Sequence, residues 1–199
     1  MNAFHTIPAH AQRGFSLIVG LIFLVAVTLL GVIAMKNTLL QERMAGGMRD
    51  RSLAFQAAEA ALRDAKLDLL NMRAGGIVCA PADNCHPNNP IVHESGFDTV
   101  CTLGRCFDDP SDGWGYGGVP GQAAWDAFPL NVNAGPSVQY GFYTGSPPIG
   151  GVAAPPRYLI EVFLDVNGIG DKKAYYRITA RAVGANQNTA VVLQEVFAP

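Results

Sequence analysis

The chain has 199 residues, with 14 Lys or Arg and 16 Asp or Glu, so its formal net charge is −2. This length suits one ordinary domain with an appendage, and the near balance of charge argues against nucleic acid as a partner. Residues 36–73 hold seven Lys or Arg against five acids, whereas residues 74–199 hold six against eleven. A basic, Ala-rich middle therefore precedes an acidic, Gly- and Pro-rich C-terminal part.

Residues 14–35 form an uncharged run made mostly of Leu, Ile, Val and Phe. A helix of about 22 residues is about 33 Å long, enough to cross a hydrocarbon core of about 30 Å. A secretory signal has a shorter apolar region and a small-residue cleavage site behind it, and a buried soluble helix is rarely apolar all round. We therefore expect a retained transmembrane helix at residues 15–35, preceded by a polar leader at residues 1–14.

A helical pattern continues over residues 36–73, as an amphipathic extension of the same helix. Its apolar side chains recur at steps of three and four: Phe55, Ala58, Leu62, Ala65, Leu69 and Met72. This stripe should pack on the head or on other helices. Gly46 and Gly47 interrupt the pattern, and each costs about 1 kcal/mol relative to Ala. They predict a bend in the helix or, alternatively, a loop between two helices.

The four cysteines lie in segments rich in Pro, Asn, Asp and Gly: Cys79, Cys85, Cys101 and Cys106. An even number of cysteines beyond a membrane span indicates disulfides in an oxidising compartment. Short loops close at low entropic cost, so we favour the pairs Cys79–Cys85 and Cys101–Cys106, while pairing between the two loops stays open. Zinc is the alternative because His86 and His93 lie nearby, but the five- and four-residue spacings fit a structural zinc site poorly.

Residues 157–198 are the most regular part of the head, which we take as residues 74–199. Three runs predict strands, at residues 157–165, 174–184 and 189–198. In the middle run, apolar and polar residues alternate, as in a half-buried antiparallel strand. A further short strand is expected within residues 137–143. A long helix laid across this antiparallel sheet gives the α+β class.

Candidate metal and aromatic sites in the head are weak. Asp165, Asn167 and Asp171 resemble the start of a calcium loop, but lysines follow where a further acidic ligand is needed, and a turn explains them better. A solvated loop likewise explains the acids at 108, 109 and 112. The large aromatics Trp114 and Trp125 are expected in the core.

No catalytic chemistry is evident in the sequence. It contains no nucleophile elbow, no H-E-x-x-H and no P-loop. We therefore predict that the chain is not an enzyme, with no catalytic residue and no cofactor.

The order of these elements resembles the type IV pilin superfamily: a leader ending at Gly14, Phe15 opening an apolar span, an amphipathic extension and a small β head. Residues 41–66 narrow the resemblance to the N-terminal region of PilX minor pilins, and residues 174–197 are similar to the end of that family. The resemblance implies that a prepilin peptidase cleaves between Gly14 and Phe15 and that Phe15 is N-methylated. The retained helix would anchor the chain in the inner membrane and later pack in the filament core.

Val19 departs from most pilins, which carry Glu at the corresponding position. The amine of a processed N-terminus is a cation in an apolar bundle and costs a few kcal/mol or more if unpaired. A Glu on the next subunit to join lowers this cost. A chain with Val19 gains less from docking beneath another subunit, which suits the first subunit and hence the tip of a filament that grows from its base.

The resemblance implies that this chain primes pilus assembly and helps to present a tip-associated adhesin, and so serves adhesion and twitching motility. Its implied partners are other minor pilins, the major pilin, the adhesin, the prepilin peptidase and the pilus assembly platform. The head would face the periplasm and then the cell surface. The nearest alternative is the tip pseudopilin of a type II secretion system, and an alternative of another class is a membrane-anchored periplasmic domain that binds zinc or calcium.

Overall fold

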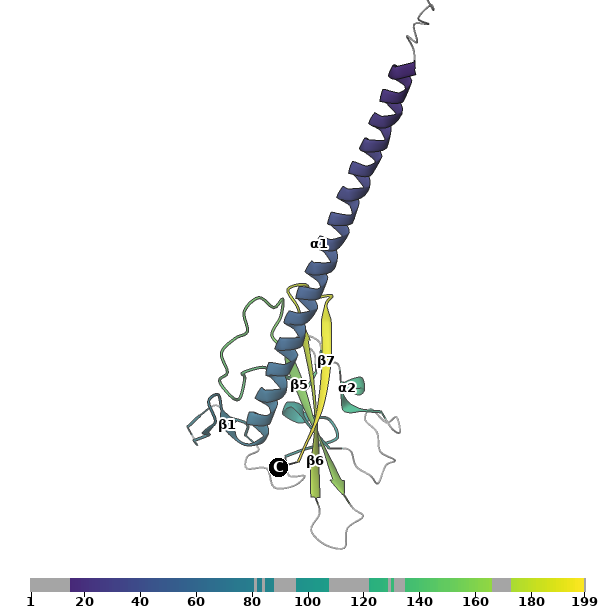
Figure 1. The fold of residues 1–199 in the computed structure, drawn as a ribbon. Coiled ribbons are helices and arrows are strands. Elements are labelled where there is room, and N and C mark those ends of the chain that lie inside the picture. Colours follow the sequence, from purple (N-terminus) through teal and green to yellow (C-terminus); the bar gives the residue numbers. More distant parts are fainter. Residues whose placement is uncertain are drawn as a thin grey trace, which may run out of the picture. The chain divides into compact units, whose positions relative to one another are not determined.

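The structure is a computed structural model, and the residues it describes are 15–80, 82–83, 85–87, 96–107, 122–128, 130, 135–165 and 173–198. The chain divides into two compact units, Met1–Gly47 and Met48–Pro199. One helix, α1 (Phe15–Leu69), runs through the boundary between these units (Figure 1). The second unit holds every strand among the described residues.

Helix α1 has 55 residues and continues through Gly46 and Gly47. The alternative of a loop between two separate helices is therefore wrong, and a bend at these glycines stays a prediction. The first part of α1 is the one helix in the described residues that is long and apolar enough to cross a membrane. Its large apolar side chains between residues 15 and 35 are exposed in this single chain.

The helix ends four residues earlier than the sequence predicts. Leu70 N still donates to the carbonyl of Lys66 at 2.9 Å, but Asn71 then takes a left-handed conformation with φ 57°. Asn tolerates this conformation better than most residues, and a helix cannot continue through it. The chain leaves α1 there and forms a small antiparallel ribbon from β1 (Met72–Arg73) and β2 (Ile77–Val78).

Five strands form the main sheet of the head, in the order β3-β5-β6-β7, with β4 also paired to β5. Their bounds are β3 (Arg105–Phe107), β4 (Val138–Gln139), β5 (Arg157–Asp165), β6 (Lys173–Val183) and β7 (Ala190–Phe197). The antiparallel meander β5-β6-β7 confirms the three predicted strands. The strand expected within residues 137–143 is only two residues long, and β3 pairs with β5 in parallel, which the sequence did not predict.

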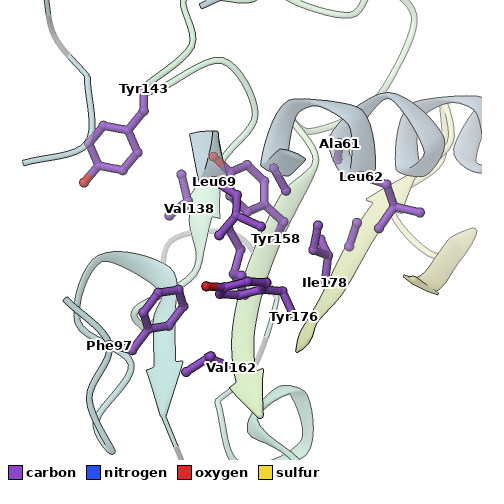
Figure 2. Packing of buried hydrophobic residues seen from close by; sticks show 13 residues of the cluster. Ala61, Leu62, Leu69, Phe97, Val138, Tyr143, Tyr158, Val162, Tyr176 and Ile178 are labelled. Carbon is purple, nitrogen blue, oxygen red and sulfur yellow. The ribbon is translucent and has the colours of Figure 1, made fainter. Parts of the chain in front are cut away.

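The C-terminal half of α1 covers one face of this sheet (Figure 1). Figure 2 shows Ala61, Leu62 and Leu69 of the helix on the same side of the sheet as Tyr158 and Ile178. The buried side of the helix is rich in small residues, which allow close approach to the strands: Ala54, Ala57, Ala58, Ala61 and Ala65 are each at most 1% exposed.

Phe55, which the sequence placed in the buried stripe, is 47% exposed. This prediction was wrong because the buried side of α1 in this turn is formed by Ala54, Ala57 and Ala58, and Phe55 lies beside that stripe. The rest of the stripe from Ala58 to Leu69 is buried as expected.

A shorter segment covers part of the opposite face of the sheet. Leu159 of β5 packs there against the buried disulfide residues Cys101 and Cys106 and against Ala124. Ala124 begins α2 (Ala124–Ala127), a single helical turn. The α1 face and this second face together give the head two hydrophobic layers around one sheet.

Candidate assembly site

Residues 15–35, in the first unit, present an apolar helix surface with no acid. Phe15 is 71% exposed and Val19 is 45% exposed, and residues 15–35 hold no charged residue. Such a surface is stable only in lipid or against other apolar helices. Gly14, on the other side of the expected cleavage point, lies outside the described residues.

Asp64 ties α1 to the loop that follows β4. Its carboxylate accepts hydrogen bonds from the Thr144 hydroxyl, from Ser146 Oγ at 2.6 Å and from Gly141 N at 2.7 Å. The side chain is buried, and burying a carboxylate is costly unless donors surround it. The three donors supply that compensation and fix the loop against the helix.

Asp68, one helical turn further, binds the strands beneath α1. It accepts a hydrogen bond from the Tyr158 hydroxyl at 3.0 Å and forms an ion pair with Arg105 at 3.4 Å, and all three side chains are buried. Burial raises the pKa of Asp68 to about 6, although the Arg105 guanidinium acts in the opposite direction. Burial also raises the pKa of Tyr158 and lowers that of Arg105.

Asp50 binds the turn between β6 and β7. It accepts hydrogen bonds from Ala185 N at 2.5 Å and Asn186 N at 3.3 Å. The Thr189 side chain and these backbone N–H groups hold the pKa of Asp50 below its ordinary value. The approach requires glycine at residue 184, because a Cβ there would lie 2.6 Å from the Asp50 carbonyl oxygen.

Glu161 organises the second face of the sheet. It is fully buried, accepts a hydrogen bond from Ala124 N at 2.9 Å, and receives both Nε and Nη2 of Arg177 at 2.7 Å. This bidentate pair is a strong geometry for arginine and carboxylate. The pair therefore holds the first turn of α2 against β5.

The structure joins Cys79 to Cys85 and Cys101 to Cys106, the two pairs that the sequence favours. Both disulfides are local, with sequence separations of 6 and 5 residues. All four cysteines are thereby used. Each disulfide stiffens one loop rather than connecting distant parts of the head.

His86 is a buried core residue beside the disulfides. Its ring centroid lies 4.6 Å from that of Tyr143, and its Nε2 is 3.3 Å from the carbonyl oxygen of Leu103. Burial, and then the charge of Arg105, lowers the pKa of His86 to about 4. Since the nearby cysteines are oxidised, and no cluster of three metal-binding side chains occurs within the described ranges, this histidine belongs to the packing of the head.

Several sites considered in the sequence lie outside the described residues: His93, Asp108, Asp109, Asp112, Trp114, Asn167 and Asp171. Asp165 ends β5. Trp125 is 40% exposed, so its expected place in the core was wrong. The single turn of α2 buries Ala124 instead, and Trp125 is the next residue round that turn.

The sequence did not point to the buried charges under α1. Asp64 and Asp68 are spaced by one helical turn next to the alanine stripe, and Arg105 lies between a glycine and a cysteine. Acids that recur with the helical period of the apolar stripe indicate carboxylates buried between the helix and the sheet. Their chemistry is that of buried groups bonded to one another, which fixes the helix on the head.

Two family models match the chain. The PilX N-terminal family matches residues 13–63, and the type IV pilus assembly protein PilX C-terminal family matches residues 76–199. Among curated proteins and among solved structures, no match is found. The two matched ranges contain most of α1 and the strands from β2 to β7.

Proposed function

The chain belongs to the PilX family of type IV pilus minor pilins, and from this membership we propose that it is incorporated at or near the pilus tip, where it primes assembly and helps to present an adhesin. The family match confirms the resemblance in the sequence. Members of this family are structural components of pili rather than enzymes, and they act together with other pilus components.

The observation that carries the proposed tip position is Val19. It lies in the exposed apolar part of α1, where no acid is present to compensate the terminal amine of a neighbouring subunit. The penalty for an unpaired amine in such surroundings is a few kcal/mol or more. A subunit that cannot relieve this penalty gains less free energy when it docks below another subunit. It is therefore better suited to be the first subunit of the filament.

The apolar helix fits a pilin that is anchored in a membrane and later enters a filament. We place the head in the periplasm before assembly, because its two disulfides need an oxidising compartment. The same helix surface that lies in lipid would then pack against other pilin helices. We expect the partners to be the other minor pilins, the major pilin and a tip adhesin, with the prepilin peptidase and the assembly platform acting earlier.

Mass analysis of the N-terminus tests the first step of this function. The full chain is expressed with and without the cognate prepilin peptidase, together with a Gly14→Val variant as the control for cleavage. We expect a mature chain that begins at methylated Phe15 only in wild-type protein and only with the peptidase. A chain that keeps Met1 under all conditions would contradict the proposal.

A deletion of the gene separates the pilus from the type II secretion alternative. We expect loss of surface pili and twitching with normal secretion, restored by the wild-type gene. Normal pili with defective secretion would favour the pseudopilin instead.

A further inference from the structure

One row of side chains crosses the second face of the sheet without an acid. Strand pairing sets Gln139 of β4 opposite Arg157 of β5, Arg157 opposite Arg181 of β6, and Arg181 opposite Val192 of β7. Directly opposite residues project from the same face with Cβ atoms about 4.5–5.5 Å apart. Two arginines therefore occupy directly opposite positions on this face, in a row that holds no acid.

The next charged row of the same face pairs its arginine with a carboxylate. Arg177 lies opposite Glu161, and the two form the bidentate ion pair described above. By contrast, no carboxylate within the described residues lies within 4.0 Å of Arg157 or Arg181. In β5, the residue opposite Arg177 is therefore an acid, Glu161. The residue opposite Arg181 is a second arginine, Arg157.

Arg157 is held in a fixed orientation. Its Nε donates to Ser137 Oγ at 2.7 Å, and its Nη2 donates to the carbonyl oxygen of Ser137. It is half-buried, and desolvation lowers its pKa without an opposing acid. A guanidinium that is already oriented loses little freedom when it binds a ligand.

The surroundings of the two arginines are partly apolar. Arg157 lines a cleft of about 320 Å³ together with Leu103 and Phe142. On the other side of the row, Val192 is 47% exposed. A site that combines one oriented arginine, a second arginine opposite it and apolar contacts on both sides suits a protein segment with an acidic side chain better than a free inorganic anion.

We propose that Arg157 and Arg181 form a binding site for a carboxylate side chain of another pilus subunit. This inference rests on the proposed function, since it takes the partner from the pilus. The incoming carboxylate would accept charge-assisted hydrogen bonds from both guanidinium groups. Arg181 would then have a carboxylate partner, as Arg177 has in Glu161.

Two variants of β6 test whether Arg181 is needed by the free head. The full-length chain in detergent is compared as wild type, Arg181→Gln and Arg177→Gln by thermal unfolding. We expect Arg181→Gln to leave Tm nearly unchanged, because Arg181 forms no ion pair within the described residues. Arg177→Gln should lower Tm by about 5–10 °C, because Glu161 stays buried without its partner. A fall in Tm for Arg181→Gln as large as that for Arg177→Gln would show a structural role and overturn the proposal.

Co-purification from pilus-producing cells tests the partner. Affinity-tagged full-length chains carry no substitution, Arg181→Glu, Arg181→Lys, or the control Arg63→Glu, which reverses an exposed charge on α1. We expect Arg181→Glu to recover about tenfold less of its partner pilin, Arg181→Lys to retain part of the binding, and Arg63→Glu to match wild type.

The outcomes separate the two levels of inference. If the wild-type chain recovers no other pilus protein, the proposed function is contradicted. The proposed binding site is then contradicted too, because its partner is taken from the pilus. If wild type and Arg181→Glu recover the same amount of every pilus protein, the site fails while the function stands. Equal losses for Arg181→Glu and Arg63→Glu would indicate a general effect of charge and would also overturn the site.

Discussion

Asp64 and Asp68 are acidic residues on the side of α1 that faces the sheet, among alanine and leucine side chains. Each is surrounded by donors from a different part of the head: a loop for Asp64, and β3 and β5 for Asp68. Buried carboxylates are stable only with such partners. These two residues therefore specify where the helix lies on the sheet more narrowly than the alanines do.

Replacing Asp64 tests its contribution to stability. We expect Asp64→Ala to lower the free energy of unfolding by about 2–4 kcal/mol, because Thr144, Ser146 and the Gly141 N–H would lose their acceptor in a buried place. Denaturant unfolding of the full chain in detergent measures the change. Asp126→Ala removes an exposed acid of α2 and should change stability by at most about 0.5 kcal/mol. Similar values for the two variants would contradict the buried role of Asp64.

Two buried groups of the head shift their pKa values in opposite directions. The pKa of Asp68 is raised to about 6 by burial, so the folded chain holds a proton there that the unfolded chain has lost, and stability falls as pH rises from about 4 to 6. The pKa of His86 is lowered to about 4, so the unfolded chain binds the extra proton, and stability rises as pH rises from about 4 to 6.5. Each effect is on the order of a few kcal/mol, and the two act in opposite directions over the same pH range.

Single substitutions should separate the pH dependence of stability due to Asp68 from that due to His86. With Asp68→Asn, stability should fall as pH is lowered from 6.5 to 4, because only His86 remains. With His86→Gln, stability should rise over the same change. Denaturant unfolding at several pH values measures the slopes, and groups shared by all chains cancel in the comparison with wild type. Parallel curves for the three proteins would show that these two residues do not titrate in this range.

At the scale of elements, α1 is bonded to the β6–β7 turn as well as to the sheet. Asp50 lies against residues 184–186 of that turn, and Lys66 forms an ion pair with Glu195 of β7 at 2.5 Å. The close approach at Gly184 leaves no room for a side chain. The turn therefore belongs to the helix interface, although it connects two strands.

Gly184→Ala should disturb this contact. The added Cβ would meet the Asp50 backbone, which cannot move without moving α1. We expect a loss of about 1–3 kcal/mol in the free energy of unfolding. Gly150→Ala is the matched control, because a Cβ there meets nothing within 4 Å, and it should leave stability unchanged or slightly higher. If Gly184→Ala were as well tolerated as Gly150→Ala, the turn would not be in contact with the helix as described.

Elements with a clear period were predictable from the sequence. The meander β5-β6-β7 and the course of α1 follow from alternation and from helical spacing. The exposure of Phe55 and the parallel strand β3 were not predictable, because they depend on contacts between distant segments. Arg105 is an example: its burial results from Asp68, which is 37 residues away. The end of α1 at Leu69 has a local cause, the left-handed Asn71, which the helical spacing alone does not indicate.

At the scale of the whole molecule, the chain has two parts that are stable in different surroundings. The first part of α1 is apolar and exposed in the single chain, whereas the head has its own core and its own disulfides. In a pilus minor pilin, the apolar helix lies first in lipid and later among other helices of the filament, while the head stays folded outside. Under the proposed function, Val19 would determine which place in the filament the chain takes.

Introducing the missing acid tests this assignment. We expect Val19→Glu to let the chain join below other subunits, so that immunogold label on purified pili spreads from one end along the shaft. Val25→Glu, which places an acid elsewhere in the same apolar run, should instead reduce incorporation, because its charge meets no amine. Label that stays at one end in Val19→Glu pili would contradict the role of Val19.

The three acids of α1 that contact the head lie between residues 50 and 68, a length of about 27 Å along the helix. Because Asp50, Asp64 and Asp68 bind three different segments, a pull along the helix axis acts on all three contacts at once. Contacts stretched in parallel share tension, whereas contacts peeled in series break one by one. The head is thus fastened to its helix in a shear geometry, which resists a force along the helix axis better than a single contact would.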